Sequence, residues 1–161
     1  MGVHAVISQN LDPVSTRDAL AAIVRSHGTH VPGLTHGLKY AFPSAATLAD
    51  ANLTACQLSI TVSSTISEFA AAVASGVVQL DGAASLDELV SSLTAIPAVD
   101  ASTAQMIALR LGHHDAFPHA DPQVGTALRL IGAGPSGSFE DVPERWRPWR
   151  ALAAAHLAAR A

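Results

Sequence analysis

Apolar residues recur at helical spacing along most of the chain, and residues that cap helices precede several of these runs. Asp12 can cap a helix that Pro13 starts, and the following residues stay compatible with a helix until Gly28. A second helix is predicted over 63–76, where apolar side chains return every three or four positions and Gly76 ends the pattern. The second pattern has the period of a helix with one buried face.

Two further helices flank a short break. The first opens with a capping box, because Ser85 is followed three positions later by Glu88. The break is the four-residue run Pro97–Asp100, and the second helix extends to about Leu111 with Gly112 as its stop. The pattern predicts a helix-hairpin-helix over about 86–111.

Shorter or less regular elements fill the remaining chain. Short helical stretches are predicted over 44–52 and 54–58, after a loop rich in glycine, proline and histidine. Asp121, which proline follows, caps another helix. The segment 140–161 supplies the last helices, with Pro148 forcing a break or a fresh start inside it.

The composition agrees with a helical domain. The 161 residues suit one domain, 1–161, that buries about two thirds of the surface its unfolded form exposes. Hydrophobic residues make up 49% of the chain and aromatic residues only 4%, which favours packing of small side chains between helices over a β-sandwich. The predicted fold class is all-α.

The single cysteine and the apolar runs bear on where the protein works. Cys56 has no cysteine to pair with, which excludes an internal disulfide and a cysteine-ligated cluster and fits a reducing compartment. It lies in an apolar stretch and is expected to be buried and inert. No apolar run reaches membrane-spanning length, and the first ten residues lack a basic region followed by an apolar one. We therefore expect a cytoplasmic protein with no membrane partner.

Charge gives a mixed indication about nucleic acid. The formal net charge of −4 means that no basic field over the whole molecule attracts it to DNA. The basic residues Arg145, Arg147 and Arg150 lie close together, however, and form either a solvated face or a local phosphate contact. The neighbouring Trp146 and Trp149 are expected to anchor the core of the last helices, because the core has few other aromatic residues.

The segment before Asp121 allows three interpretations. Asp121 can be a plain helix cap, a metal ligand or a chemically active carboxylate. A metal site would draw on the polar side chains just before it, which are His113, His114, Asp115 and His119. These residues fall in a connecting loop that is polar in any case.

Three segments in the same order resemble the helix-hairpin-helix DNA glycosylases, and specifically the bacterial 3-methyladenine DNA glycosylase II (AlkA-type) family. They are "AVISQNLD" near the start, "LTAIPAVDASTAQMIALRLGHHDAFPHAD" in the middle and "ERWRPWRALAAAHL" toward the end. The last segment nearly reproduces the family's E-R-W-R-P-W-R pattern. The resemblance covers nearly all of 2–157 and implies a helix-hairpin-helix glycosylase-like helical domain.

The resemblance implies a function in base-excision repair. Such enzymes flip an alkylated base out of double-stranded DNA and break its N-glycosidic bond. Asp121 matches the family's essential aspartate. Ser102 stands where bifunctional relatives carry a lyase lysine, which implies a monofunctional hydrolase without strand cleavage. No cofactor and no metal are implied, and the expected location is the cytoplasm, in association with the nucleoid.

The same resemblance implies sites for the DNA backbone and for the flipped base. The implied DNA-binding residues are Pro97, Ala98, Val99, Asp100, Ser102, Thr103, Gln9 and Asn10. The implied base pocket comprises Ser102, Met106 and Trp149. The chain departs from the family at Ala98 and Asp100, which replace hairpin glycines, and at Ser102 and Met106, which replace aromatic rings.

Two alternatives stay open beside the enzyme. Substitutions in the hairpin and the pocket favour a catalytically impaired relative that acts as a DNA-binding or protein-interaction module. A small metal-binding protein built on the histidine loop is a third class. The chain also begins where the helical part of the family begins. Two interpretations stay open, a shortened protein or one part of a split pair in which a partner chain supplies the N-terminal subdomain.

Overall fold

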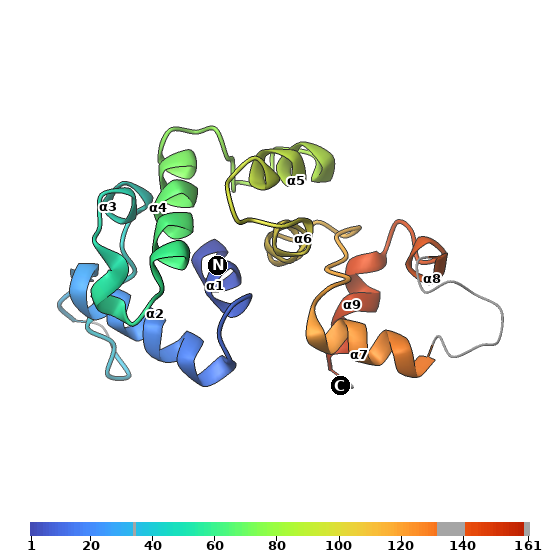
Figure 1. Ribbon diagram of the computed structural model, residues 1–161, viewed down its shortest axis with the longest axis horizontal. Helices are drawn as coiled ribbons and strands as arrows, with labels where there is room; N and C mark the ends of the chain where they lie inside the picture. Colours follow the sequence, from blue (N-terminus) through green and yellow to red (C-terminus); the bar gives the residue numbers. More distant parts are fainter. Residues whose placement is uncertain (34, 132–140, 160–161) are drawn as a thin grey trace. The chain divides into compact units, whose positions relative to one another are not determined.

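The computed structural model describes residues 1–33, 35–131 and 141–159. These residues are mostly helical, which confirms the predicted all-α class, and they include one two-stranded antiparallel ribbon (Figure 1). In chain order the elements are α1 (Gly2–Ser8), α2 (Pro13–His27), β1 (Thr29–His30), β2 (Tyr40–Ala41), α3 (Ala45–Ala49), the 3-10 helix η1 (Leu53–Cys56), α4 (Ile60–Ala74), α5 (Leu86–Thr94), α6 (Ala101–Arg110), α7 (Pro122–Ile131), α8 (Asp141–Glu144) and α9 (Arg150–Ala158). Among the helices of the described ranges, none has both the length and the apolar character needed to cross a membrane.

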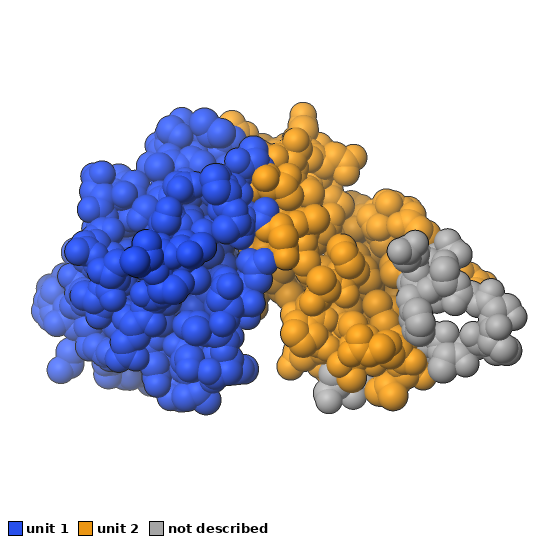
Figure 2. Space-filling model, viewed as in Figure 1, with its two compact units in different colours: residues 1–78, 95–99 blue, residues 79–94, 100–161 orange. Residues whose placement is uncertain are grey.

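The chain divides into two compact units (Figure 2). Unit 1 comprises Met1–Val78 and Ala95–Val99, and unit 2 comprises Gln79–Thr94 and Asp100–Ala161. The chain therefore leaves unit 1, forms α5 in unit 2, returns through the break before α6, and then stays in unit 2. The expectation of one domain over 1–161 stays a prediction.

Unit 1 is built on the packing of α1 against α2 and α4, and of α4 against α3. Its core includes the fully buried side chains of Ile7, Ile23, Leu53, Cys56 and Ile66. Cys56 is buried, as its apolar surroundings predicted. About 1.5–3 kcal/mol of hydrophobic free energy accompanies the burial of each large aliphatic side chain of this kind.

The start of the chain forms α1, which the sequence patterns did not predict. Met1 precedes this helix and makes no side-chain cap, and five of the seven helix residues are buried, so neither a cap nor a broad polar face marks the helix. Gly2 lies against Phe69 of α4, because a Cβ on Gly2 would be 2.2 Å from the ring atom Cζ. Close approach of α1 to α4 therefore requires a glycine at position 2.

The predicted helix starts in unit 1 are largely confirmed. Asp12 caps α2 by accepting the N–H groups of Val14 and Ser15 at 2.9 and 3.1 Å. Ser59 caps α4, which begins three residues before the predicted start because this hydroxyl accepts the N–H of Val62 at 3.2 Å. The stretch predicted as a helix over 54–58 is instead the 3-10 helix η1.

Unit 2 begins with α5 and α6, which pack against each other. The capping box before α5 is confirmed, since the N–H of Ser85 donates to Glu88 Oε2 at 2.9 Å and the N–H of Glu88 donates to Ser85 Oγ at 3.3 Å. Burial of Leu89, Leu93 and Ile107 joins the two helices. The helix-break-helix pattern predicted over about 86–111 is present.

A second cluster of buried side chains joins α7 to α9. It consists of Phe117, Val124, Ala127, Leu128, Ala154 and Leu157, and Trp146 packs against it. Trp146 is therefore a core anchor, as expected. Trp149 is not, because it is 59% exposed at the N-cap position of α9 and its ring lies beside that of His114, 5.4 Å between centroids. The expectation for Trp149 was wrong because the indole lies outside the apolar face that α9 turns toward α7.

Candidate functional site

Asp121 lies in unit 2 and is the N-cap of α7. Its Oδ1 accepts the N–H groups of Gln123 and Val124 at 3.0 and 3.1 Å, and Pro122 occupies the first helical position. Both cap bonds use Oδ1, so Oδ2 takes no part in the cap. The side chain is half-buried. The capping interpretation of Asp121 is therefore correct, and a second role for the same carboxylate is compatible with it.

The segment that leads to Asp121 begins with a tight stop to α6. Gly112 adopts φ +95°, a left-handed conformation that favours glycine. The N–H of Gly112 donates to Leu109 O and the N–H of His113 donates to Ala108 O, each at 3.1 Å. This pair of bonds is a Schellman motif, and it turns the chain sharply at the end of α6.

Ion pairs connect this segment to the last helices. Arg150 is 12% exposed and binds Asp115 with two parallel bonds, Nε to Oδ1 at 2.8 Å and Nη2 to Oδ2 at 2.9 Å. Arg147 also binds Asp115, and both arginines bind Glu144. Two members of the predicted arginine cluster, Arg147 and Arg150, therefore pair with carboxylates of their own chain.

The network lowers the pKa values of its carboxyl groups. Burial of Asp115 raises its pKa, but the hydrogen bond and charge of Arg150 and the charge of Arg147 outweigh burial, and the pKa lies below the ordinary 3.8. Hydrogen bonding to Arg147 lowers the pKa of Glu144 below 4.5. Asp115 is thus a fixed anion at neutral pH, and a guanidinium holds both of its oxygens.

The polar residues of this loop do not converge on a metal site. Among residues 1–33, 35–131 and 141–159, no three His, Cys, Asp or Glu side chains lie close enough together to hold a metal ion. Of the four residues considered for such a site, Asp115 is bound to the arginines and His114 lies beside Trp149.

The break between α5 and α6 is a tight turn. The N–H of Val99 donates to Ile96 O at 3.1 Å, Pro97 follows Ile96, and Ala98 has φ +61°. These are the features of a type II turn, whose third residue favours glycine. Ala98 therefore holds the left-handed conformation at the position where the family has a glycine.

Asp100 ends the turn and caps α6. Its Oδ1 accepts the N–H of Thr103 at 2.7 Å. Among the residues predicted to bind DNA here, Pro97, Ala98 and Asp100 are exposed, whereas the side chains of Val99 and Thr103 are buried at 5%. With their side chains buried, Val99 and Thr103 could contact DNA only through the backbone. The N–H groups of both residues, however, already donate within the chain, to Ile96 O and to Asp100 Oδ1.

The other two predicted DNA-binding residues lie in unit 1. Gln9 and Asn10 follow α1 and are exposed. The amide of Asn10 donates to Val6 O at 3.3 Å and its N–H to Ile7 O at 3.0 Å, so Asn10 closes the end of α1. The role of both residues toward DNA stays a prediction.

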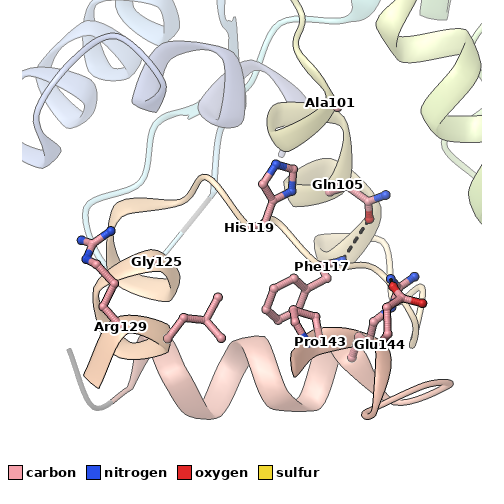
Figure 3. A pocket seen from close by; sticks show the side chains of 10 residues that line it. Ala101, Gln105, Phe117, His119, Gly125, Arg129, Pro143 and Glu144 are labelled. Carbon is pink, nitrogen blue, oxygen red and sulfur yellow. Dashed lines mark hydrogen bonds and ion pairs between the residues drawn. The ribbon is translucent and has the colours of Figure 1, made fainter. Parts of the chain in front are cut away.

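Unit 2 has a pocket of about 590 Å³ (Figure 3). Its lining residues are Ala101, Gln105, Phe117, His119, Gly125, Leu128, Arg129, Pro143, Glu144 and Arg150. None of the predicted base-pocket residues lines it. Ser102 and Met106 lie one turn apart on another face of α6 and are half-buried, and Trp149 is exposed.

Gln105 is a pocket residue that no sequence pattern indicated. Gln105 Oε1 accepts the backbone N–H of Phe117 at 2.9 Å, across twelve positions of the chain (Figure 3). No local pattern marks Gln105, because a glutamine in a helix is ordinary and its partner is a backbone group.

Comparison with known proteins matches nearly the whole chain to DNA repair proteins. No protein-family model matches the chain. The chain is 30% identical over 157 residues to the "Probable bifunctional transcriptional activator/DNA repair enzyme AlkA" of Mycobacterium tuberculosis. The match covers 96% of this chain and 32% of the relative, so the chain spans about a third of the relative's length.

Two solved structures have the same fold. The 3-methyladenine DNA-glycosylase from Archaeoglobus fulgidus is 27% identical with a TM-score of 0.77, covering 98% of this chain and 56% of that one. The Clostridium acetobutylicum 8-oxoguanine glycosylase/lyase in complex with double-stranded DNA is 18% identical with a TM-score of 0.82, covering 98% and 57%. The chain is therefore a homologue of the AlkA-type DNA repair proteins and has the fold of the helix-hairpin-helix DNA glycosylases.

Proposed function

We propose that the protein is a DNA glycosylase that hydrolyses the N-glycosidic bond of alkylated purines in double-stranded DNA. The observation that carries the proposal is the half-buried carboxylate of Asp121 at the start of α7, fixed through Oδ1 by two backbone N–H groups. Support comes from the relatives, since one is named as a DNA repair enzyme and another as a 3-methyladenine DNA-glycosylase. The activity belongs to base-excision repair.

The chemistry requires little beyond a well-placed anion. A purine methylated at N3 or N7 is cationic and leaves readily, so no strong general acid is needed. As the bond to the base breaks, the sugar becomes electron-poor, and a carboxylate stabilises it electrostatically and guides the attacking water. Asp121 suits this task, because the cap bonds hold its side chain while Oδ2 takes no part in the cap.

We further propose that the enzyme is monofunctional and uses no cofactor. Strand cleavage by a lyase needs an amine that forms a Schiff base with the sugar. The chain has Ser102, a half-buried hydroxyl, at the position of the lyase lysine. A hydroxyl cannot form a Schiff base, so the reaction ends at the abasic site.

The second candidate function is a DNA-binding or protein-interaction module without catalysis. It is favoured by Asp100, whose carboxylate occupies the N-terminus of α6 in the hairpin. It is also favoured by Ser102 and Met106, which offer no ring to stack on a cationic base. Stacking of this kind is worth about 1–3 kcal/mol per base.

Release of 3-methyladenine from methylated duplex DNA tests the two candidates. The wild-type protein and Asp121→Asn are compared under single-turnover conditions, with circular dichroism to show that both are folded. Release by the wild type that falls by at least about two orders of magnitude in the variant supports the enzyme, since electrostatic stabilisers contribute on this scale. Equal release by both removes Asp121 from the mechanism, and no release by either favours the binding module.

A further inference from the structure

The loop between α6 and α7 is held at two points before it reaches Asp121. We call residues 113–120 the Asp121 loop. One point of attachment is the start of α9, and the other is the side chain of Gln105 on α6. Both points lie in unit 2.

The first attachment combines an ion pair with a backbone bond. The guanidinium of Arg150 binds both oxygens of Asp115 at 2.8 and 2.9 Å, and the N–H of Ala151 donates to His114 O at 2.9 Å. Two parallel bonds restrict the orientation of both partners as well as their distance. The low exposure of Arg150, 12%, limits competition from water. Neighbouring residues of the Asp121 loop are therefore fixed to consecutive residues of α9.

The second attachment lies two residues further along. Gln105 Oε1 accepts the N–H of Phe117 at 2.9 Å (Figure 3). Phe117 is 5% exposed, and its ring lies beside that of Trp146, with centroids 6.1 Å apart. A side-chain oxygen on α6 thus satisfies a backbone group whose own side chain is buried. The contact fixes the position of Phe117, and with it the Asp121 loop, along the axis of α6.

Short local bonds carry this placement on to Asp121. The N–H of His119 donates to Phe117 O at 3.0 Å, and the N–H of Asp121 donates to Pro118 O at 3.1 Å. Pro118 is fully buried, which leaves this stretch little freedom to adjust. A shift of Phe117 would therefore displace Asp121, which lies four residues later and caps α7.

We propose that Gln105 and Arg150 are positioning residues that set the place of the Asp121 carboxylate in the reaction. The inference rests on the proposed function, because it concerns the group assigned to the chemistry. Neither residue has a described contact with Asp121, and each acts through the Asp121 loop. Misplacement of a reacting group by about 1 Å can lower a rate about 100-fold, so loss of an attachment can impair catalysis in a folded protein.

Substitutions at Gln105 separate positioning from simple stability. Gln105→Met keeps the length of the side chain and removes the acceptor, whereas Gln105→Glu keeps an acceptor oxygen and serves as the conservative rescue. Arg150→Lys keeps the positive charge but cannot make the two parallel bonds to the oxygens of Asp115. Gln79→Met, at an exposed position of the same unit, is the matched control.

Two readouts are measured for each variant. Amide hydrogen exchange at Phe117, Gln123 and Val124 reports the Asp121 loop and the cap directly, with α4 amides as an internal reference. We expect Gln105→Met and Arg150→Lys to speed exchange at the cap about tenfold or more, and Gln105→Glu to stay close to wild type. Single-turnover release of 3-methyladenine should fall about tenfold in the two impaired variants, with the Kd for duplex DNA changed less than about twofold.

The outcomes distinguish this proposal from the proposed function. Faster exchange at Phe117 with unchanged exchange at Gln123 and Val124 would overturn positioning, since the disturbance would not reach the cap. Unchanged release in Gln105→Met, in an active wild type, would overturn it as well. If the wild type releases no base, the proposed function fails, and the exchange measurements still decide whether the two residues hold the cap.

Discussion

The carboxylate of Asp100 accepts the backbone N–H of Thr103 at 2.7 Å, so the first turn of α6 is capped from within the chain. An anion therefore already lies at the turn that the family resemblance predicts to contact the DNA backbone. A phosphate that comes to this turn meets a like charge and finds one N–H group in use.

We expect Asp100→Asn to increase the affinity for duplex DNA. Asparagine caps helices about as well as aspartate, so the turn keeps its shape while the charge is lost. Two unit charges 4 Å apart in water repel by about 1 kcal/mol, which corresponds to a gain of about fivefold in affinity. Fluorescence anisotropy with a labelled duplex at low and moderate salt measures the gain.

The salt dependence provides the control for Asp100→Asn. The gain should shrink as salt is raised, because screening weakens the repulsion in the wild type. Asp18→Asn removes an exposed carboxylate from α2 and should change affinity much less. Equal gains in both variants would mean that only net charge matters, and would argue against DNA contact at the hairpin.

Ala98→Gly should stabilise the protein. Ala98 has φ +61°, and a left-handed conformation costs a residue with a Cβ about 1–2 kcal/mol. Glycine avoids that cost, but it also makes the unfolded chain more flexible, which lowers stability. The expected net gain in the free energy of unfolding is therefore about 0.5–1 kcal/mol. Urea denaturation measures it.

The same exchange inside a helix should have the opposite sign. Ala71 is exposed in α4, and Ala71→Gly should lower the free energy of unfolding by about 1 kcal/mol. A loss of stability in both variants would contradict the left-handed turn at Ala98.

Two substitutions of Asp121 should separate its cap from its chemistry. Asp121→Asn keeps an oxygen that can accept the N–H groups of Gln123 and Val124, so stability should change by less than about 0.5 kcal/mol. Asp121→Ala loses the cap and should lower the free energy of unfolding by about 1 kcal/mol. Thermal denaturation gives the stability, and base release should be lost in both variants.

A drop in stability for Asp121→Asn as large as that for Asp121→Ala would show that the negative charge itself stabilises α7. Loss of activity in the asparagine variant could then no longer be assigned to chemistry alone. Asp12→Asn, at the cap of α2, is the matched control for the exchange of a capping aspartate.

The ion pair between Asp115 and Arg150 should make stability depend on pH. The pKa of Asp115 lies below its ordinary 3.8 in the folded protein, so the folded state binds this proton less readily than the unfolded chain does. The stabilisation is therefore complete above the unfolded pKa and is lost as pH falls through the folded one. Charge-assisted hydrogen bonds of this kind are worth about 1.5–3 kcal/mol.

Urea denaturation of the wild type and Asp115→Asn at two pH values checks this prediction. The difference in the free energy of unfolding should be about 1.5–3 kcal/mol at pH 6 and should shrink as the pH is lowered below about 4. Asp18→Asn, whose ion pair with Arg17 is exposed, should differ from wild type by less than about 1 kcal/mol at either pH. A difference that does not vary with pH would mean that Asp115 acts through packing alone.

The helices that the sequence predicted well are those with local signals. Asp12, Ser85 and Asp121 each cap the helix they precede, and the residues that identify each cap lie within three positions. The helix α1 was missed because Met1 provides no side-chain cap and the helix is short, with five of its seven residues buried. The ribbon of β1 and β2 was missed because its strands have two residues each and lie in a loop rich in glycine and proline.

The candidate site was predicted only as far as resemblance to a family reaches. That resemblance assigned chemistry to Asp121 and DNA contacts to the hairpin, which stay predictions, and it did not reveal which hairpin groups are exposed. Asp115 and Arg150 are 35 positions apart, and Gln105 and Phe117 are twelve apart, with one partner in the second pair a backbone group. Contacts at such separations depend on how helices pack, which no spacing in the sequence reveals.

The bond between Asp115 and Arg150 also limits how this chain can be recombined with its relatives. The acid precedes α7 and the base begins α9, so a chimera with a crossover anywhere between them takes the two partners from different parents. Such a chimera should fold well only if both parents carry this pair. Crossovers before Asp115 or after Arg150 keep the partners together and should be tolerated more often.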